Sequence, residues 1–229
     1  MFILIMLSEV RDMLDFSILI NYYEMFLDGL KVTIIASVIA LLASFVIGAI
    51  VAVMRITPFA ILRWIGTAYV EFFRNIPLVV IAFFFFLGPP TIGIRFSGLV
   101  AGTIALSIYT SAFIAEAIRS GILSVAKGQM EAARSSGLTY IQAMRLIILP
   151  QAIKIVIPPI GNQFINLVKN SSILALIAGT DLMYQADLIS AKTFVVFDVY
   201  IFVALFYLLL TIPLSLGVGY LEKRLAVSH

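Results

Sequence analysis

Residues Glu131 to Pro150 read EAARSSGLTYIQAMRLIILP, and long apolar segments flank this stretch on both sides. It lies within a polar region from about Ser120 to Lys154, in a chain whose remaining length is mostly apolar. A polar, helix-forming region between apolar segments is typical of an element that projects from a membrane domain. The stretch therefore indicates a chain that crosses a membrane several times and exposes one structured element to water.

Composition supports a membrane protein. Of the 229 residues, 62% are hydrophobic and 12% are charged, whereas soluble domains average about 25% charged residues. Such a chain has too few polar side chains to cover a soluble surface, so we expect an all-α integral membrane protein that forms a single domain over residues 1–229. The chain has no cysteine, which excludes disulfides and thiolate metal sites. The single histidine, His229, is the last residue and suits a disordered terminus.

Hydropathy predicts five transmembrane helices. The first follows an N-terminal interfacial segment of about residues 1–29, whose amphipathic part runs from about Asp15 to Asp28. The apolar start MFILIML has no positive flank and is a poor signal peptide. Ser44 and Gly48 in the first span are small enough to let a neighbouring helix approach. The expected spans are about Leu30–Met54, Tyr69–Leu87, Gly98–Ile118, Ile155–Ala178 and Phe194–Val218.

The basic residues predict the orientation. With five spans, one side of the membrane carries nine Lys or Arg and the other carries three. Because Lys and Arg concentrate in cytoplasmic loops, we expect the N-terminus outside, and the C-terminus and the polar region in the cytoplasm. The nine are Arg55, Arg63, Arg119, Lys127, Arg134, Arg145, Lys154, Lys223 and Arg224, and the three are Arg11, Arg95 and Lys192.

Local propensities predict a helical hairpin in the polar region. Glycines suit helix ends, so a first helix is expected from about Gly128 to Ser136, followed by Gly137. A second is expected from about Tyr140 to Leu149, stopped by Pro150. A short rigid hairpin can fit the groove of another subunit and transmit its motion.

The spacing in this hairpin resembles a known motif. It is similar to the EAA loop of the membrane-spanning permease subunits of bacterial ABC importers. The matching positions are Glu131, Ala132, Ala133, Gly137, Ile147, Leu149 and Pro150. Three further segments look like the polar amino acid subfamily: Val70–Leu78 (VEFFRNIPL), Ala112–Ile122 (AFIAEAIRSGI) and Lys169–Leu174 (KNSSIL).

The resemblance implies a type I importer fold, with a cytoplasmic coupling helix between spans three and four. It also implies partners: ABC ATPase subunits below, a second permease copy or a related permease, and an extracellular solute-binding protein that delivers an amino acid. The seven matching residues would contact the ATPase. The chain has no G-x-x-x-x-G-K-[ST] motif to bind nucleotide. We therefore expect a non-catalytic subunit without cofactor, in the bacterial inner membrane, with ATP bound by its partner and no nucleic acid bound.

Polar side chains within spans are candidates for substrate contacts, because they are costly in lipid. Gln163, Asn166 and Asn170 fall within about a 60° arc of the fourth span. Thr103, Ser107 and Thr110 form a similar arc on the third. The amides favour substrate contact, whereas the hydroxyls are better suited to bond their own helix.

The second span carries a further polar group. Glu71 and Arg74 are three residues apart and suit an ion pair, and Pro77 should kink or interrupt the helix. Arg74 and Asn75 are candidates for substrate contacts or for structural roles. Lys169 leaves the amide arc by about 100° from Asn170, and the sequence assigns it no role.

These observations predict the permease subunit of an ATP-driven importer for polar amino acids. The amide arc lacks a carboxylate for a cationic side chain, which favours a neutral substrate such as glutamine. Acidic substrates stay open if Arg74 faces the path. The alternative is an ion-coupled amino acid transporter or channel without an ATPase, which would need buried carboxylates on its path.

Overall fold

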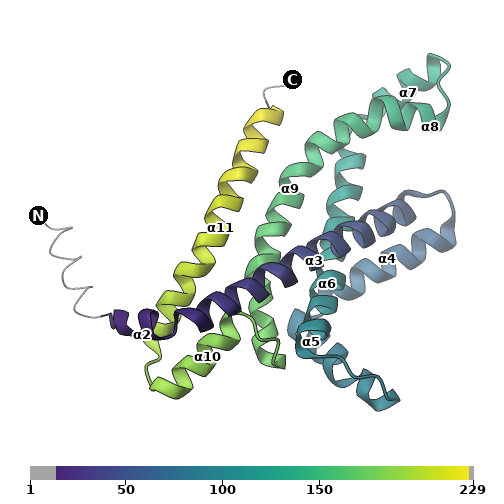
Figure 1. The fold of residues 1–229 in the computed structure, drawn as a ribbon. Helices are drawn as coiled ribbons and strands as arrows, with labels where there is room; N and C mark the ends of the chain where they lie inside the picture. The colour runs from purple at the N-terminus through teal and green to yellow at the C-terminus, as the bar shows by residue number, and fades with distance from the viewer. Residues whose placement is uncertain (1–13, 227–229) are drawn as a thin grey trace, which may run out of the picture.

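The computed structural model describes residues 14–226, in which every regular element is a helix (Figure 1). The predictions for His229 and for the apolar start of the chain fall outside this range. In chain order the elements are α2 (Phe16–Asn21), α3 (Tyr23–Ile56), α4 (Ala60–Asn75), α5 (Leu78–Leu87), η1 (Pro89–Ile92), α6 (Gly98–Ser124), α7 (Lys127–Ser135), α8 (Tyr140–Ala143), the π turn η2 (Met144–Ile148), α9 (Leu149–Asn170), η3 (Ser171–Ile177), α10 (Leu182–Thr193) and α11 (Phe197–Ala226).

The predicted all-α membrane fold is confirmed. Four continuous helical stretches are long and apolar enough to cross a membrane, and α4 with α5 and η1 adds a fifth span if this bent pair is counted as one. The α7–α8 hairpin projects at one end of the molecule, and α2 and α10 lie at the opposite end (Figure 1). The four stretches are Tyr23–Ile56, Gly98–Ser124, Tyr140–Ile177 and Phe197–Leu225.

The second span is broken. The expected helix over Tyr69–Leu87 is wrong in its bounds, because α4 begins at Ala60 and the chain turns by 102° between α4 and α5. Pro77 causes the interruption that the sequence predicts: it has no N–H to continue the helix, and it forces Ile76 into an extended conformation (φ −99°, ψ 135°).

Small residues bring α3 and α6 together. Ser44 and Gly48 are buried, as the sequence predicts, and α6 is the neighbour that they admit. A Cβ atom on Gly48 would lie 2.8 Å from Cγ2 of Ile114. Further along, Ala36 and Ala40 of α3 share a buried cluster with Leu106 of α6. Helix pairs in membranes associate through such close backbone approach, so α3 and α6 form the centre of the fold.

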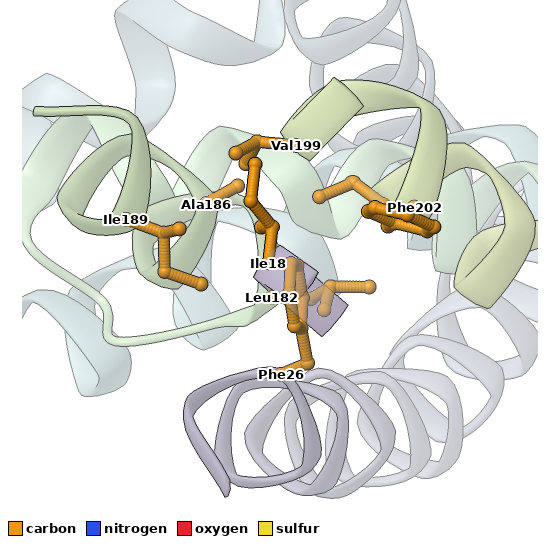
Figure 2. Packing of buried hydrophobic residues seen from close by; sticks show 8 residues of the cluster. Ile18, Phe26, Leu182, Ala186, Ile189, Val199 and Phe202 are labelled. Carbon is orange, nitrogen blue, oxygen red and sulfur yellow. The ribbon is translucent and has the colours of Figure 1, made fainter. Parts of the chain in front are cut away.

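The predicted amphipathic helix over Asp15–Asp28 is divided. Only α2 is separate, since the chain bends at Tyr22 and α3 begins at Tyr23. Ile18 of α2 and Phe26 of α3 are buried against α10 and α11 (Figure 2). The cluster joins two regions far apart in sequence, α2 with α3 and α10 with α11, and its other buried members are Leu182, Ala186, Ile189, Val199, Phe202 and Val203. The position of this region at the membrane surface stays a prediction.

Pro150 does not stop a helix, so that prediction is wrong. Helical structure continues from Tyr140 through η2 into α9, and Pro150 occupies its first turn. A proline ring normally clashes with the carbonyl four residues earlier. Here the preceding turn is a wider π turn, in which Leu149 N–H bonds to the carbonyl of Met144. The π turn makes room for the ring and keeps the helix continuous.

Candidate functional site

The first helix of the polar hairpin forms close to its predicted bounds, whereas the second continues past Pro150 into α9. α7 ends at Ser135, and Gly137 follows with a left-handed backbone (φ 85°). The amide of Gly137 bonds to the carbonyl of Arg134 (3.1 Å), and the next amide, of Leu138, bonds to that of Ala133 (3.2 Å). A glycine in this conformation is the usual end of a helix because it avoids the Cβ penalty. Thr139 then starts α8 with a capping box.

The hairpin exposes both polar and apolar side chains. Within the motif, Glu131, Ala132, Gly137 and Pro150 are exposed, and Ile147 and Leu149 are half-buried. Ala133 is buried and supports the hairpin instead of lining its surface. Large apolar side chains are also exposed at this polar end of the molecule: Tyr140, Ile141 and Leu146. Apolar side chains rimmed by polar ones are typical of a protein-binding surface.

The amide arc lies on an uncovered face of α9. Ile160 and Leu167 are buried in clusters with residues of α6. On the amide side, Asn166 is exposed, and Gln163 and Asn170 are half-buried. Beside the arc, Asn162 is also exposed, and sequence reasoning missed it although it lies only about 40° from Asn166 on the same helix. The chain alone therefore leaves these amides uncovered on a membrane helix.

The hydroxyl arc on α6 has a different environment. Ser107 and Thr110 are buried, at 6% and 2% exposure. The hydroxyl of Ser107 donates to the carbonyl of Thr103 (2.7 Å), and that of Thr103 donates to the carbonyl of Leu99 (2.7 Å). The hydroxyls of Thr103 and Ser107 therefore have hydrogen-bond partners within their own helix, as the structural interpretation predicts. Contact of Ser107 and Thr110 with substrate stays a prediction.

The expected ion pair between Glu71 and Arg74 does not form among the described residues. The guanidinium carbon of Arg74 lies 5.3 Å from the ring centre of Phe113, in a cation–π contact. Asn75 donates its side-chain amide to the carbonyl of Glu71 (2.6 Å). Because α4 ends here, Arg74 can turn toward α6, and the side chain of Asn75 bonds back to the last turn of its own helix. Both Arg74 and Asn75 are exposed at the break.

Sequence reasoning missed an ion-pair network between α3 and α6. Arg55 pairs through Nη1 with Oε2 of Glu116. Arg119 donates from Nη2 to Oε1 of the same carboxylate (2.6 Å), and Ser120 donates to it as well (3.1 Å). The available signal was that Arg55 and Glu116 fall near the same predicted membrane boundary, at the end of the first and of the third predicted span.

Lys169 lines a cavity of about 340 Å³ between α9, α10 and α11. The side chain is exposed and points away from the clusters that α9 buries. The cavity therefore offers a cation next to the uncovered amide face of the same helix. Its other lining residues are Ser172, Met183, Tyr200, Val203, Ala204 and Tyr207.

A buried carboxylate lies near this cavity. Asp181 is fully buried and caps α10 by accepting from the amides of Met183 (3.2 Å) and Tyr184 (3.3 Å). Burial raises the pKa of Asp181 from 3.8 to about 6, and the nearby Asp187 carboxylate acts in the same direction. The folded protein therefore binds this proton more tightly than the unfolded chain does.

We expect Asp181 to make stability depend on pH. Since folding raises the pKa of Asp181, its protonated carboxyl stabilises the folded protein fully below about pH 4. This contribution to the free energy of unfolding is lost as pH rises through about 6. Thermal melting of the purified protein in detergent, from pH 4 to 7, would measure this. Relative to Asp181→Asn, the wild type should lose melting temperature over that range. A constant difference between the two proteins would contradict the prediction.

The sequence resembles known transport proteins over most of its length. Residues 44–227 match the family model for "Binding-protein-dependent transport system inner membrane component". The chain is 70% identical over 216 residues to the "Probable glutamine ABC transporter permease protein GlnM" of Bacillus subtilis (strain 168), covering 94% of this chain and all of that protein. It is 40% identical over 200 residues to the "Probable glutamine ABC transporter permease protein GlnP" of the same organism, covering 86% of this chain and 92% of that protein.

A solved structure shows the same fold. It is described as "Crystal structure of an amino acid ABC transporter with histidines", and it superposes with a TM-score of 0.88 at 36% identity, covering 92% of this chain and 99% of that one. The family match extends over most of the chain and includes the α7–α8 hairpin. The chain therefore belongs to the membrane permeases of binding-protein-dependent ABC transport systems.

Proposed function

We propose that this protein is the permease subunit of an importer that moves glutamine, or a closely related polar amino acid, into the cytoplasm. The observation that carries the proposal is the 70% identity to the "Probable glutamine ABC transporter permease protein GlnM" over that protein's whole length. The uncovered amide face of α9 supports it, since amides can bond the side-chain amide of glutamine without a charge mismatch. ATP hydrolysis is assigned to partner ATPases, and substrate delivery to an extracellular binding protein.

A second permease would cover the amide face. Exposed amides such as Asn166 are costly in lipid, so they belong on a protein interface or a water-filled path. A pathway between two permeases meets both requirements, with a second copy of this chain or a related permease as the partner. Within this arrangement, Gln163, Asn166 and Asn170 contact the substrate's side chain.

Two cations are candidates for the substrate's carboxylate. Lys169 follows Asn166 by three residues, so their side chains are neighbours on the surface of α9. Arg74 lies at the break of the second span, with its guanidinium over Phe113. We assign the α-carboxylate to Lys169, because it lines a cavity and neighbours Asn166 on the surface of α9.

The ion-coupled alternative is not favoured. Such a transporter needs a carboxylate that is free to bind a cation or proton along its path. The carboxylate of Glu116 is engaged by both Arg55 and Arg119, and Glu71 lies exposed at the break of the second span. The family match also points to a subunit that depends on partners.

ATP-driven uptake would test the function. Proteoliposomes would contain this chain with the ATPase and binding protein encoded beside it, and labelled glutamine would be the substrate. Unlabelled glutamate, aspartate, arginine, histidine and cystine would compete. We expect uptake that requires ATP and is inhibited best by neutral polar amino acids. Uptake that proceeds without ATP would overturn the proposal.

Selectivity should respond to charge on the amide arc. We expect Gln163→Glu to make arginine a much better competitor of uptake, by about ten- to a hundredfold, because a desolvated carboxylate–guanidinium pair contributes about 1.5–3 kcal/mol. Gln163→Met is the matched control, since it removes the amide without adding charge. The measurement is the concentration of arginine that halves glutamine uptake. An equal change in both variants would exclude Gln163 from selectivity.

The α7–α8 hairpin is proposed to bind the ATPase. We expect Gly137→Val to weaken ATPase binding by about five- to thirtyfold, since a side chain in the left-handed conformation costs about 1–2 kcal/mol. Space is not the cause, because no atom lies within 4 Å of a Cβ built on Gly137. Gly137→Asn is the control, as asparagine tolerates this conformation. Co-purification of the ATPase measures binding, and equal loss in both variants would contradict the backbone argument.

A further inference from the structure

The buried end of Arg55 depends on one contact. Arg55 lies in the last turn of α3, and its side chain is only 7% exposed. Its Nη1 pairs with Glu116, while its Nε is buried without a hydrogen-bond partner among the described residues. A buried charge is costly unless it is paired. Glu116 therefore fixes the charged end of Arg55 and holds α3 against α6.

Glu116 is itself held within α6. Its carboxylate accepts from Nη2 of Arg119 (2.6 Å), from Nε of Arg119 (3.2 Å) and from the hydroxyl of Ser120 (3.1 Å). All three donors lie on the same helix, three and four residues further along. When α6 moves, the carboxylate of Glu116 moves with it. The Arg55–Glu116 contact then displaces the C-terminal end of α3 in the same direction.

The α6 helix is also joined to the α7–α8 hairpin. α6 ends at Ser124, and α7 begins three residues later, at Lys127. Val125 between them is buried in a cluster with Ile148 and Ala152, against which Met130 of α7 packs. A displacement of the hairpin is therefore passed to the end of α6 through packed side chains, which resist deformation.

α4 rests on the aliphatic part of Arg55. A Cβ atom on Gly66 would lie 2.9 Å from Cγ of Arg55, so the backbone of α4 touches this side chain. α3 and α4 are connected by a short segment around Pro58 and form a hairpin. The arginine therefore contacts α4 through its stem and α6 through its charged end.

We infer that the Arg55–Glu116 contact transmits movement of the α7–α8 hairpin from α6 to the α3–α4 hairpin, which carries Arg74 and leads to the break at Pro77. This inference rests on the proposed function, because it requires an ATPase that moves the α7–α8 hairpin. Arg55 and Glu116 act as positioning residues and touch no substrate. Without the contact, α6 follows the ATPase while α3 and α4 lag behind, and ATP is hydrolysed with less transport.

Arg55→Met tests the transmission. Methionine keeps an unbranched apolar stem under Gly66, and Glu116 keeps its bonds to Arg119. In the reconstituted complex, we expect the glutamine imported per ATP hydrolysed to fall by about two- to thirtyfold, the range for mutations along coupling networks. Arg63→Met is the matched control, because Arg63 is an exposed arginine of α4 outside the network. Arg55→Lys should restore part of the ratio.

A distance measurement separates transmission from simple structural support. The chain has no cysteine, so Phe59→Cys and Leu123→Cys introduce two exposed labelling sites at the ends of α4 and α6. We expect spin labels at these sites to keep one distance when ATP binds, and to show a changed or broader distance when Arg55→Met is added.

The outcomes are distinct. The inference is overturned if Arg55→Met imports as much glutamine per ATP hydrolysed as the wild type does. It is also overturned if the distance between the spin labels changes neither on ATP binding nor on adding Arg55→Met. Loss of co-purified ATPase in Arg55→Met also overturns it, because the role would then be assembly. If the wild-type complex shows no ATP-driven uptake, it is the proposed function that fails.

Discussion

Gly98→Ala should be among the most damaging single methyl additions to this protein. A Cβ atom at this position would lie 1.7 Å from the carbonyl oxygen of Ile177 and 2.9 Å from the carbonyl carbon of Ala178. Both contacts are with backbone, so no side-chain rotation relieves them. We expect a loss of about 3 kcal/mol or more, the upper end for overpacked sites, because the start of α6 must separate from η3.

The matched control is Gly219→Ala. This glycine lies in α11, and no atom is within 4 Å of a Cβ built on it. The same substitution should there be neutral or stabilise the helix by up to about 1 kcal/mol. Thermal aggregation in detergent and ATP-driven uptake would compare the two variants. Equal stability of both would show that α6 and η3 do not pack as closely as described.

The sequence predicted four of the five spans and the first helix of the hairpin well, because both depend on local properties. Long apolar stretches identify spans whatever the packing, and Gly137 ends α7 through its own backbone preference. The break at Pro77 was likewise local. Its 102° angle was not predictable, since α5 turns to bury Ile81 and Ala82 against α6 and η3.

Misjudged elements depended on contacts between distant segments or on an unusual turn. The helix α10 was not predicted, and it is held by side chains such as Phe26 and Phe202 that come from α3 and α11. Pro150 was expected to end a helix because proline usually does, and only the π turn at Met144–Ile148 reveals why it does not.

The candidate site was predictable in part. The amide arc follows from helical spacing alone, and the structure leaves its side chains uncovered. The ion pair of Glu71 and Arg74 was expected from the same rule and does not form, because spacing permits a contact without excluding a better one, here Phe113. The Arg55–Glu116 pair joins residues 61 positions apart, which no local rule connects.

Glu116→Leu should destabilise the protein by about 3 kcal/mol, the lower end of the cost of removing one partner from a buried ion pair, because the side chain of Glu116 is 22% exposed. The leucine would leave the guanidinium of Arg55, at 7% side-chain exposure, without its carboxylate. The double variant Arg55→Met with Glu116→Leu should recover most of this loss, since it removes both charges and fills similar volume. Thermal melting in detergent would compare Glu116→Leu, Arg55→Met and the double variant.

The recovery of stability in the double variant identifies the cause of the loss. If the double variant were as unstable as Glu116→Leu, the loss would come from packing around residue 116 rather than from an unpaired charge. In that case α3 and α6 would be held together chiefly by small residues such as Gly48 and Ser44, and the ion pair would contribute little to their association.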